Sequence, residues 1–142
     1  MSAHETLIVE VADGVATVTL NRPDALNSFN AAMRAELTGL WAELRGDEAV
    51  RCILVTGAGD RAFCTGIDRA EAMADIDPDS DGLDGYVTPF MFDDPGHAMC
   101  PKANELWKPV VAAVNGMACG GAFYLLGEAD VIVAAESATF FD

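Results

Sequence analysis

Hydrophobic and polar residues alternate along two short segments near the start of the chain. Residues 6–11 and 15–21 combine this alternation with β-branched side chains, and Asp13-Gly14 lies between them. A period of two predicts a strand, and an Asp-Gly pair between two such runs predicts a tight hairpin. The chain is therefore expected to open with two antiparallel strands.

From about residue 30 to residue 45 the apolar positions change to helical spacing. Large apolar side chains recur every three or four residues, at Met33, Leu37, Leu40, Trp41 and Leu44. This pattern predicts an amphipathic helix with Ser28 or Asn30 as its N-cap and Gly46 as its stop. The short apolar run of residues 51–56 predicts a strand buried on both faces.

Residues 75–95 are rich in Asp, Pro and Gly and lack any sustained period, which predicts a surface loop that could act as a lid. The later pattern predicts a helix, a strand, a glycine-rich turn, a short helix and a strand, with the regular elements at 96–107, 110–114, 121–126 and 131–135. Alternating strands and helices predict a layered α/β core, in one domain spanning residues 1–142. Periodicity does not give the strand order.

Composition narrows the class of protein. A chain of 142 residues with 51% hydrophobic content can form one domain with a moderate core. No apolar run reaches the roughly 18 residues that cross a bilayer, and the first residues lack a signal-peptide pattern, so we expect a cytoplasmic protein without membrane contact. The cysteines lack zinc-site spacing and are expected to be reduced, buried thiols with no metal: Cys52, Cys64, Cys100 and Cys119.

Eight Lys and Arg against 23 Asp and Glu give a formal charge of −15. This charge opposes binding to nucleic acid or to an anionic membrane, and it leaves any phosphate group to local basic residues and backbone N–H groups. The run 77–82 resembles the first half of a calcium loop. The twelfth position of that loop is Thr88 instead of Glu, so a solvated acidic loop is the better interpretation.

Two glycine-containing turns each follow a buried strand and precede a helical stretch, at residues 62–68 and 115–122. Glycine allows a sharp turn and leaves N–H groups free at a helix start, where an anionic oxygen is favoured. Two such turns on neighbouring strands could direct two N–H groups at one carbonyl oxygen, as an oxyanion hole does. Each turn taken alone is more often a plain connection.

Three segments, in this order and spacing, resemble the signature blocks of the enoyl-CoA hydratase/isomerase (crotonase) superfamily: residues 20–27, 62–68 and 108–121. The resemblance covers nearly the whole chain. It implies a spiral of β-β-α units, an acyl-CoA thioester substrate with coenzyme A as part of it and no separate cofactor, and an enolate or related oxyanion. It also implies self-association as a trimer or hexamer.

Members of this family run to roughly 250 residues, so the resemblance implies that the chain is the N-terminal, CoA-binding portion of a longer protein. A shorter version of the fold would leave strand edges and apolar faces uncovered. By the same resemblance, Ile67 and Gly121 match the positions whose N–H groups form the oxyanion hole.

Several positions match segments of the family that contact coenzyme A: Ala25, Leu26, Thr65, Gly66, Asp68 and Gly120. The family often has a basic residue where this chain has Asp24. Arg22 and Arg69 are the nearby residues that could contact a phosphate instead.

In hydratases of this family the first catalytic Glu lies three residues after the oxyanion glycine, where this sequence has Tyr124. The second lies just beyond the strand that ends at Asp142. Tyr124 could donate a proton, Asp142 could act as an alternative carboxylate, and His97 could pair with it as a base. The plainer interpretations are a packed Tyr, an exposed Asp and a solvated His.

Three functions therefore stay open. The first is a lyase or isomerase of the enoyl-CoA hydratase type in fatty acid metabolism. The second is a carbon–carbon bond hydrolase that uses His97 and Asp142 as acid and base. The third is a catalytically silent CoA-binding or assembly protein.

Overall fold

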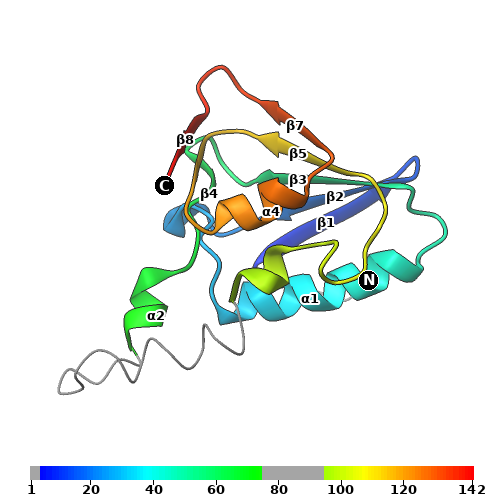
Figure 1. Ribbon diagram of the computed structural model, residues 1–142, viewed down its shortest axis with the longest axis horizontal. Helices are drawn as coiled ribbons and strands as arrows, with labels where there is room; N and C mark the ends of the chain where they lie inside the picture. The colour runs from blue at the N-terminus through cyan, green and yellow to red at the C-terminus, as the bar shows by residue number, and fades with distance from the viewer. Residues whose placement is uncertain (1–3, 75–94) are drawn as a thin grey trace.

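The computed structural model describes residues 4–74 and 95–142, whose path is drawn in Figure 1. Strand-strand-helix units follow one another along the chain. The elements are β1 (Leu7–Ala12), β2 (Val15–Leu20), η1 (Pro23–Ala25), α1 (Ala31–Gly46), β3 (Cys52–Gly57), β4 (Ala62–Cys64), α2 (Arg69–Ala74), η2 (Pro95–Met99), β5 (Val110–Val114), β6 (Met117–Cys119), α4 (Ala122–Glu128), β7 (Val131–Ala134) and β8 (Thr139–Phe141). The predicted loop, apart from Pro95, and the calcium-like run lie outside the described residues.

The strands form two sheets. The larger has the order β1-β2-β3-β5-β7, with β1 antiparallel to β2 and every other pair parallel. The smaller sheet, β4-β6-β8, is parallel throughout. Each strand of the small sheet directly follows one of the large sheet in the chain, so the turns after β4 and β6 are brought to neighbouring positions.

Helix α1 buries its apolar stripe against the large sheet (Figure 1). All five predicted apolar positions of the helix are buried. Of the two candidate caps, Asn30 is the N-cap, since its Oδ1 accepts a hydrogen bond from the Met33 N–H at 3.0 Å. Trp41 Nε1 donates to the Ala98 carbonyl at 2.8 Å, which fastens η2 to this helix.

The predicted helix over residues 96–107 is wrong. The segment contains the short 3₁₀ helix η2 followed by turns. Pro101 lacks an N–H and disfavours a helical backbone at Cys100, and Glu105 has a φ of 62°, in the left-handed region that ends helices. Asn104 Nδ2 closes the turn by donating to the carbonyls of His97 at 2.9 Å and Cys100 at 2.8 Å.

Strands β4 and β6 were not predicted, because three residues are too few to show an alternating pattern. Cys64 and Cys119 therefore lie in strands and not in turns. All four thiols are free; Cys64 and Cys100 are buried as expected, whereas Cys52 and Cys119 are partly exposed.

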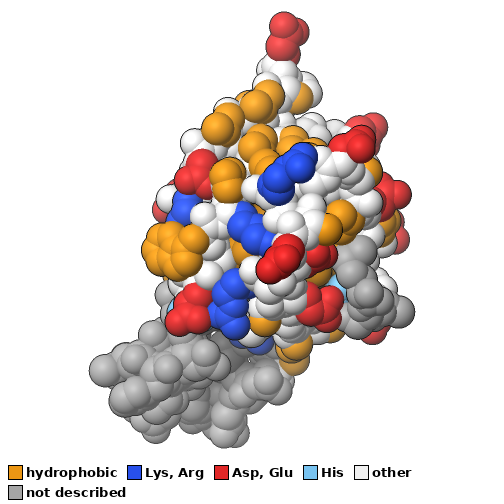
Figure 2. All heavy atoms as spheres, turned by 90° about the vertical axis from the view of Figure 1, so that its right-hand side faces the viewer, with side chains coloured by type: hydrophobic (Ala, Val, Ile, Leu, Met, Phe, Trp, Pro, Cys, Tyr) orange, Lys and Arg blue, Asp and Glu red, His pale blue; other side chains and the backbone are white. Residues whose placement is uncertain are grey.

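Strands β7 and β8 are the outer strands at one end of their sheets. Their apolar side chains are about half exposed, at Val131, Ile132, Val133, Phe140 and Phe141. Figure 2 shows apolar side chains gathered on the upper part of one face, at the height of β7 in Figure 1. No helix among the described residues is both long and apolar enough to cross a membrane.

Candidate functional site

A pocket of about 660 Å³ lies beside α4, between the turns that follow β4 and β6. Its lining residues are Phe29, Ile67, Gly96, Gly120, Gly121, Phe123, Tyr124 and Asp142. The fold thus brings together five residues that the sequence marked as candidates, which come from three separate segments of the chain: Ile67, Gly120, Gly121, Tyr124 and Asp142.

Two glycines allow the two turns to touch. Gly66 has a φ of +86°, and a Cβ added there would lie 2.6 Å from the Gly121 backbone nitrogen. A Cβ on Gly121 would lie 2.6 Å from the edge of the Phe29 ring. Neither position accepts a side chain without displacing its neighbour, so the close approach depends on glycine at both.

The backbone around Ile67 leaves one N–H group unused. Phe29 N donates to the Gly66 carbonyl at 2.8 Å, and Asp68 N donates to the Phe29 carbonyl at 3.0 Å. Within residues 4–74 and 95–142, neither the Ile67 N–H nor the Gly121 N–H donates a hydrogen bond. Both residues line the pocket, so two backbone donors are available to an oxygen atom bound there.

The predicted CoA-contacting segments lie side by side but mostly outside the pocket lining. Thr65 Oγ1 donates to the Leu26 carbonyl at 3.3 Å, which joins the loop after β2 to the turn after β4. Of the residues predicted to contact coenzyme A, Gly120 is the one among the pocket-lining residues, whereas Ala25, Leu26, Thr65, Gly66, Asp68 and both arginines are not.

The two arginines proposed as phosphate contacts have different surroundings. Arg22 Nη2 lies 2.9 Å from Asp68 Oδ2, and its Nη1 donates to the Ser28 carbonyl at 2.6 Å. Its guanidinium is therefore already engaged within the protein. Arg69 is exposed and has no ion-pair partner among the described residues, which leaves it the freer of the two to meet a phosphate.

The Asp68 carboxylate accepts hydrogen bonds both from Arg22 and from N–H groups at the start of α2. Its Oδ1 accepts from the N–H groups of Ala70 at 3.1 Å and Glu71 at 3.3 Å. The hydrogen bond from Arg22, with smaller contributions from these N–H groups, lowers the pKa of Asp68 below its ordinary value. The ionised carboxylate is thus the form that the folded turn prefers.

The Asp68→Asn variant should lose about 1 kcal/mol of unfolding free energy at neutral pH, because the charge pair with Arg22 is removed. Since folding lowers the pKa of Asp68, the pair contributes fully above the unfolded carboxyl pKa of about 3.9 and is lost as the pH falls toward the lowered folded value. Urea unfolding at pH 7 and pH 3 should show the difference between wild type and variant shrinking in acid. An equal difference at both pH values would mean that the charge is not its cause.

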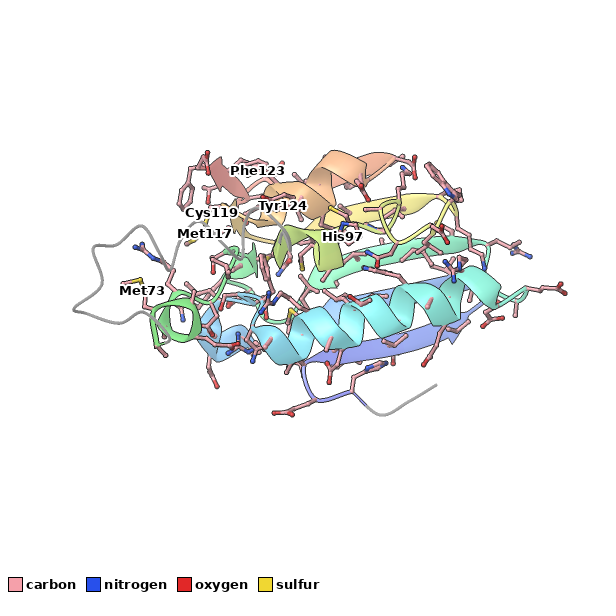
Figure 3. All side chains as sticks on the ribbon, turned by 60° about the horizontal axis from the view of Figure 1, so that its bottom comes forward. Met73, His97, Met117, Cys119, Phe123 and Tyr124 are labelled. Atoms are coloured by element: carbon pink, nitrogen blue, oxygen red, sulfur yellow. The ribbon has the colours of Figure 1, made fainter. Side chains whose placement is uncertain are left out.

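Tyr124 and Asp142 are the lining residues with acid or base chemistry. The Tyr124 ring packs against Gly96, where an added Cβ would lie 2.5 Å from ring atoms Cδ2 and Cε2. Asp142 is exposed; after burial, its charge is the second cause that raises the pKa of the Cys119 thiol. Figure 3 labels Tyr124 on α4 and Cys119 on β6, two elements that contact each other.

His97 lies on η2, near α4, with an exposed side chain, and does not belong to the pocket lining (Figure 3). Its neighbour Gly96 belongs to the pocket lining. No hydrogen bond or ion pair joins His97 to Asp142 in the part of the chain that the structure describes. The structure does not bring this pair together as the carbon–carbon bond hydrolase hypothesis requires.

Sequence reasoning missed three lining residues, namely Phe29, Gly96 and Phe123. Phe123 precedes Tyr124 on a short helix, and its aromatic character was the one local signal available.

Burial raises the pKa of the Cys64 thiol, which precedes the turn after β4, to about 12, and its sulfur accepts a hydrogen bond from Gly66 N at 3.4 Å. Among the described residues no group of His, Cys, Asp and Glu is placed to hold a metal.

Comparison with known proteins assigns the family. The sequence profile described as enoyl-CoA hydratase/isomerase matches residues 10–142. The chain belongs to the enoyl-CoA hydratase/isomerase family. Similar curated members of the family include the 1,2-epoxyphenylacetyl-CoA isomerase of Escherichia coli (strain K12), which is 39% identical over 136 residues, 96% of this chain and 50% of the relative. The (E)-benzylidenesuccinyl-CoA hydratase of Thauera aromatica is 37% identical over 132 residues, 93% of this chain and 48% of the relative.

Solved structures of enoyl-CoA hydratase/isomerase family members have the same fold. One from Xanthobacter autotrophicus Py2 aligns with a TM-score of 0.79 at 30% identity, over 97% of this chain and 49% of that one. Another, from Mycobacterium paratuberculosis, aligns with a TM-score of 0.77 at 35% identity, over 99% and 49%. The predicted family and the predicted spiral of β-β-α units are confirmed. The chain spans about half the length of the curated relatives it matches.

Proposed function

We propose that the protein processes an acyl-CoA thioester and that the N–H groups of Ile67 and Gly121 together hold the thioester carbonyl oxygen. One observation carries this proposal: two unpaired backbone donors, from turns that touch, line one pocket in a member of the enoyl-CoA hydratase/isomerase family. The two curated relatives above are also named for acyl-CoA substrates.

The chemistry follows from where charge develops. When a proton leaves the carbon beside a thioester carbonyl, or a nucleophile adds to a conjugated double bond, negative charge moves onto the carbonyl oxygen. Oriented N–H dipoles stabilise that charge by about 3 kcal/mol per donor, because they need no reorganisation during the reaction. A shared oxyanion step of this kind suits both a lyase and an isomerase.

The proton transfers fall to side chains of the same pocket. Asp142 is the carboxylate among the described lining residues and is the candidate base, while Tyr124 is the candidate proton donor. Isomerisation needs one group that removes and returns a proton, whereas hydration also needs an activated water.

The carbon–carbon bond hydrolase draws less support, because His97 lies outside the pocket lining. Trimeric or hexameric assembly and a cytoplasmic location stay predictions.

Removing one N–H donor tests the proposal. Gly121 has a φ of −61°, which proline adopts, so Gly121→Pro deletes this N–H and is compatible with the φ of residue 121. Gly121→Ala keeps the N–H and is the matched control; both variants are made in a Phe29→Leu background to remove the ring atoms that a Cβ would meet. The ligand is a ketone analogue in which a methylene replaces the sulfur of an acyl-CoA.

The proline variant should bind the ketone analogue about tenfold more weakly than the alanine variant, the value of one hydrogen bond to a carbonyl. Equal affinities would rule out Gly121 N–H as a donor. Turnover of an enoyl thioester by the unmodified protein separates an enzyme from a silent CoA-binding protein. If no thioester tested is turned over, the silent CoA-binding protein is favoured.

A further inference from the structure

We infer that the acyl group of the substrate carries an uncharged aromatic ring, held among Phe29, Phe123 and Tyr124. This inference rests on the proposed function, because it places the thioester carbonyl at Ile67 and Gly121. Three of the eight lining residues are aromatic, against 8% aromatic residues in the whole sequence. The aromatic residues thus line the same pocket as the two donors.

Two of the three rings, those of Phe29 and Tyr124, pack against the protein backbone. Phe29 is fully buried, its backbone is paired with the turn that carries Ile67, and its ring edge packs against Gly121. Phe123 and Tyr124 are 41% and 43% exposed, and Tyr124 rests against Gly96. A second ring inserted here would make edge or offset contacts, which add attraction beyond the burial of apolar area.

The pocket has room for such a group. An apolar cavity of about 150 Å³ is enough to hold benzene. The pocket volume of about 660 Å³ therefore leaves space for a ring in addition to the thioester. A short acyl chain would leave the rings of Phe123 and Tyr124 without a contact partner in the ligand.

Charge decides between aryl groups and carboxyl-bearing acyl groups. Asp142 is the one charged side chain among the described lining residues, and no Lys, Arg or His belongs to that lining. A second carboxylate on the acyl group would enter a pocket that already carries the negative charge of Asp142, and no cation among the described lining residues would pair with it. The pocket therefore favours a neutral ring over a dicarboxylic acyl group.

The test compares the dissociation constants of four ketone analogues of CoA thioesters, with phenylacetyl, cyclohexylacetyl, acetyl and succinyl groups. The phenylacetyl analogue should bind at least about tenfold more tightly than the acetyl and succinyl analogues, and more tightly than the cyclohexylacetyl analogue. If acetyl or succinyl binds as tightly while Gly121→Pro still weakens binding, the inference is wrong and the proposed function stands. If none of the four binds, both are wrong.

Phe123→Ala locates the preference in the pocket. The ratio of acetyl to phenylacetyl dissociation constants should fall about fivefold in this variant, because one wall of the ring site is lost. Trp107→Ala is the matched control, since Trp107 is 74% exposed and lies outside the lining; its ratio should equal that of the wild type. Both residues are exposed enough for the variants to fold, which thermal melting checks. An unchanged ratio in Phe123→Ala would overturn the inference.

Discussion

In the Gly66→Ala variant, the rate of the proposed thioester processing should fall by about a thousandfold or more. The variant should also lose about 3 kcal/mol of unfolding free energy. The backbone at Gly66 has a φ of +86°, which costs an L-residue about 1–2 kcal/mol. The added Cβ would also lie 2.6 Å from the backbone nitrogen of Gly121, an atom that no change of rotamer can move. The two turns must separate, and the two donors no longer face one oxygen.

Chemical denaturation and turnover, measured on the same preparation, check this expectation. Gly39→Ala is the matched control: Gly39 lies in α1, and a Cβ there would have no atom within 4 Å. That variant should gain up to about 1 kcal/mol, because alanine is the better helix former, and should keep its turnover. If Gly66→Ala behaved like the control, contact between the two turns would not be needed for activity.

The Asn27→Ala variant is expected to lose about 4 kcal/mol of unfolding free energy. Asn27 is fully buried, and its Nδ2 donates to the carbonyls of Ala58 at 2.9 Å and Ala62 at 2.8 Å. Its Oδ1 accepts from Arg22 N at 2.9 Å. Each buried group left without a partner costs about 1–3 kcal/mol. The φ of 54° at this residue adds a further penalty, since Asn tolerates the left-handed region better than Ala.

Two further substitutions separate these causes in equilibrium unfolding. Asn27→Gly relieves the backbone and should recover about 1 kcal/mol relative to Asn27→Ala. Asn104 donates the same number of bonds to carbonyls but is partly exposed, so Asn104→Ala should cost only about 1 kcal/mol. Equal losses in Asn27→Ala and Asn104→Ala would show that burial is not the reason for the large effect.

The elements with a clear period or a sustained apolar run were predictable from the sequence, and the three-residue strands β4 and β6 were not. Helix α1 has five apolar residues at helical spacing, and all five are buried. The strand predicted at residues 110–114 is β5. The expected helix over residues 96–107 failed because local spacing does not register the restriction that Pro101 places on Cys100 or the left-handed turn at Glu105.

The candidate site was predictable in its backbone and not in its walls. The glycine-containing turns indicated where backbone N–H groups could be free, and the family resemblance pointed to Ile67 and Gly121, which both line the pocket. Phe29 and Gly96 reach the same pocket from distant segments, through packing that no local pattern records. The role of His97 stays a prediction: the segment forms η2 in place of a helix, and the pocket is lined by its neighbour Gly96.

The hydrogen-bonding capacity that Ile67 brings to the pocket belongs to its backbone. Every amino acid except proline carries that N–H, so almost any codon change at position 67 preserves the donor as long as the turn keeps its shape. A codon change at position 124 or 142, in contrast, would replace the side chain that we propose to transfer the proton. With the proposed donors, one reaction could replace another through substitution of the pocket side chains, while the backbone contacts to the oxygen atom are kept.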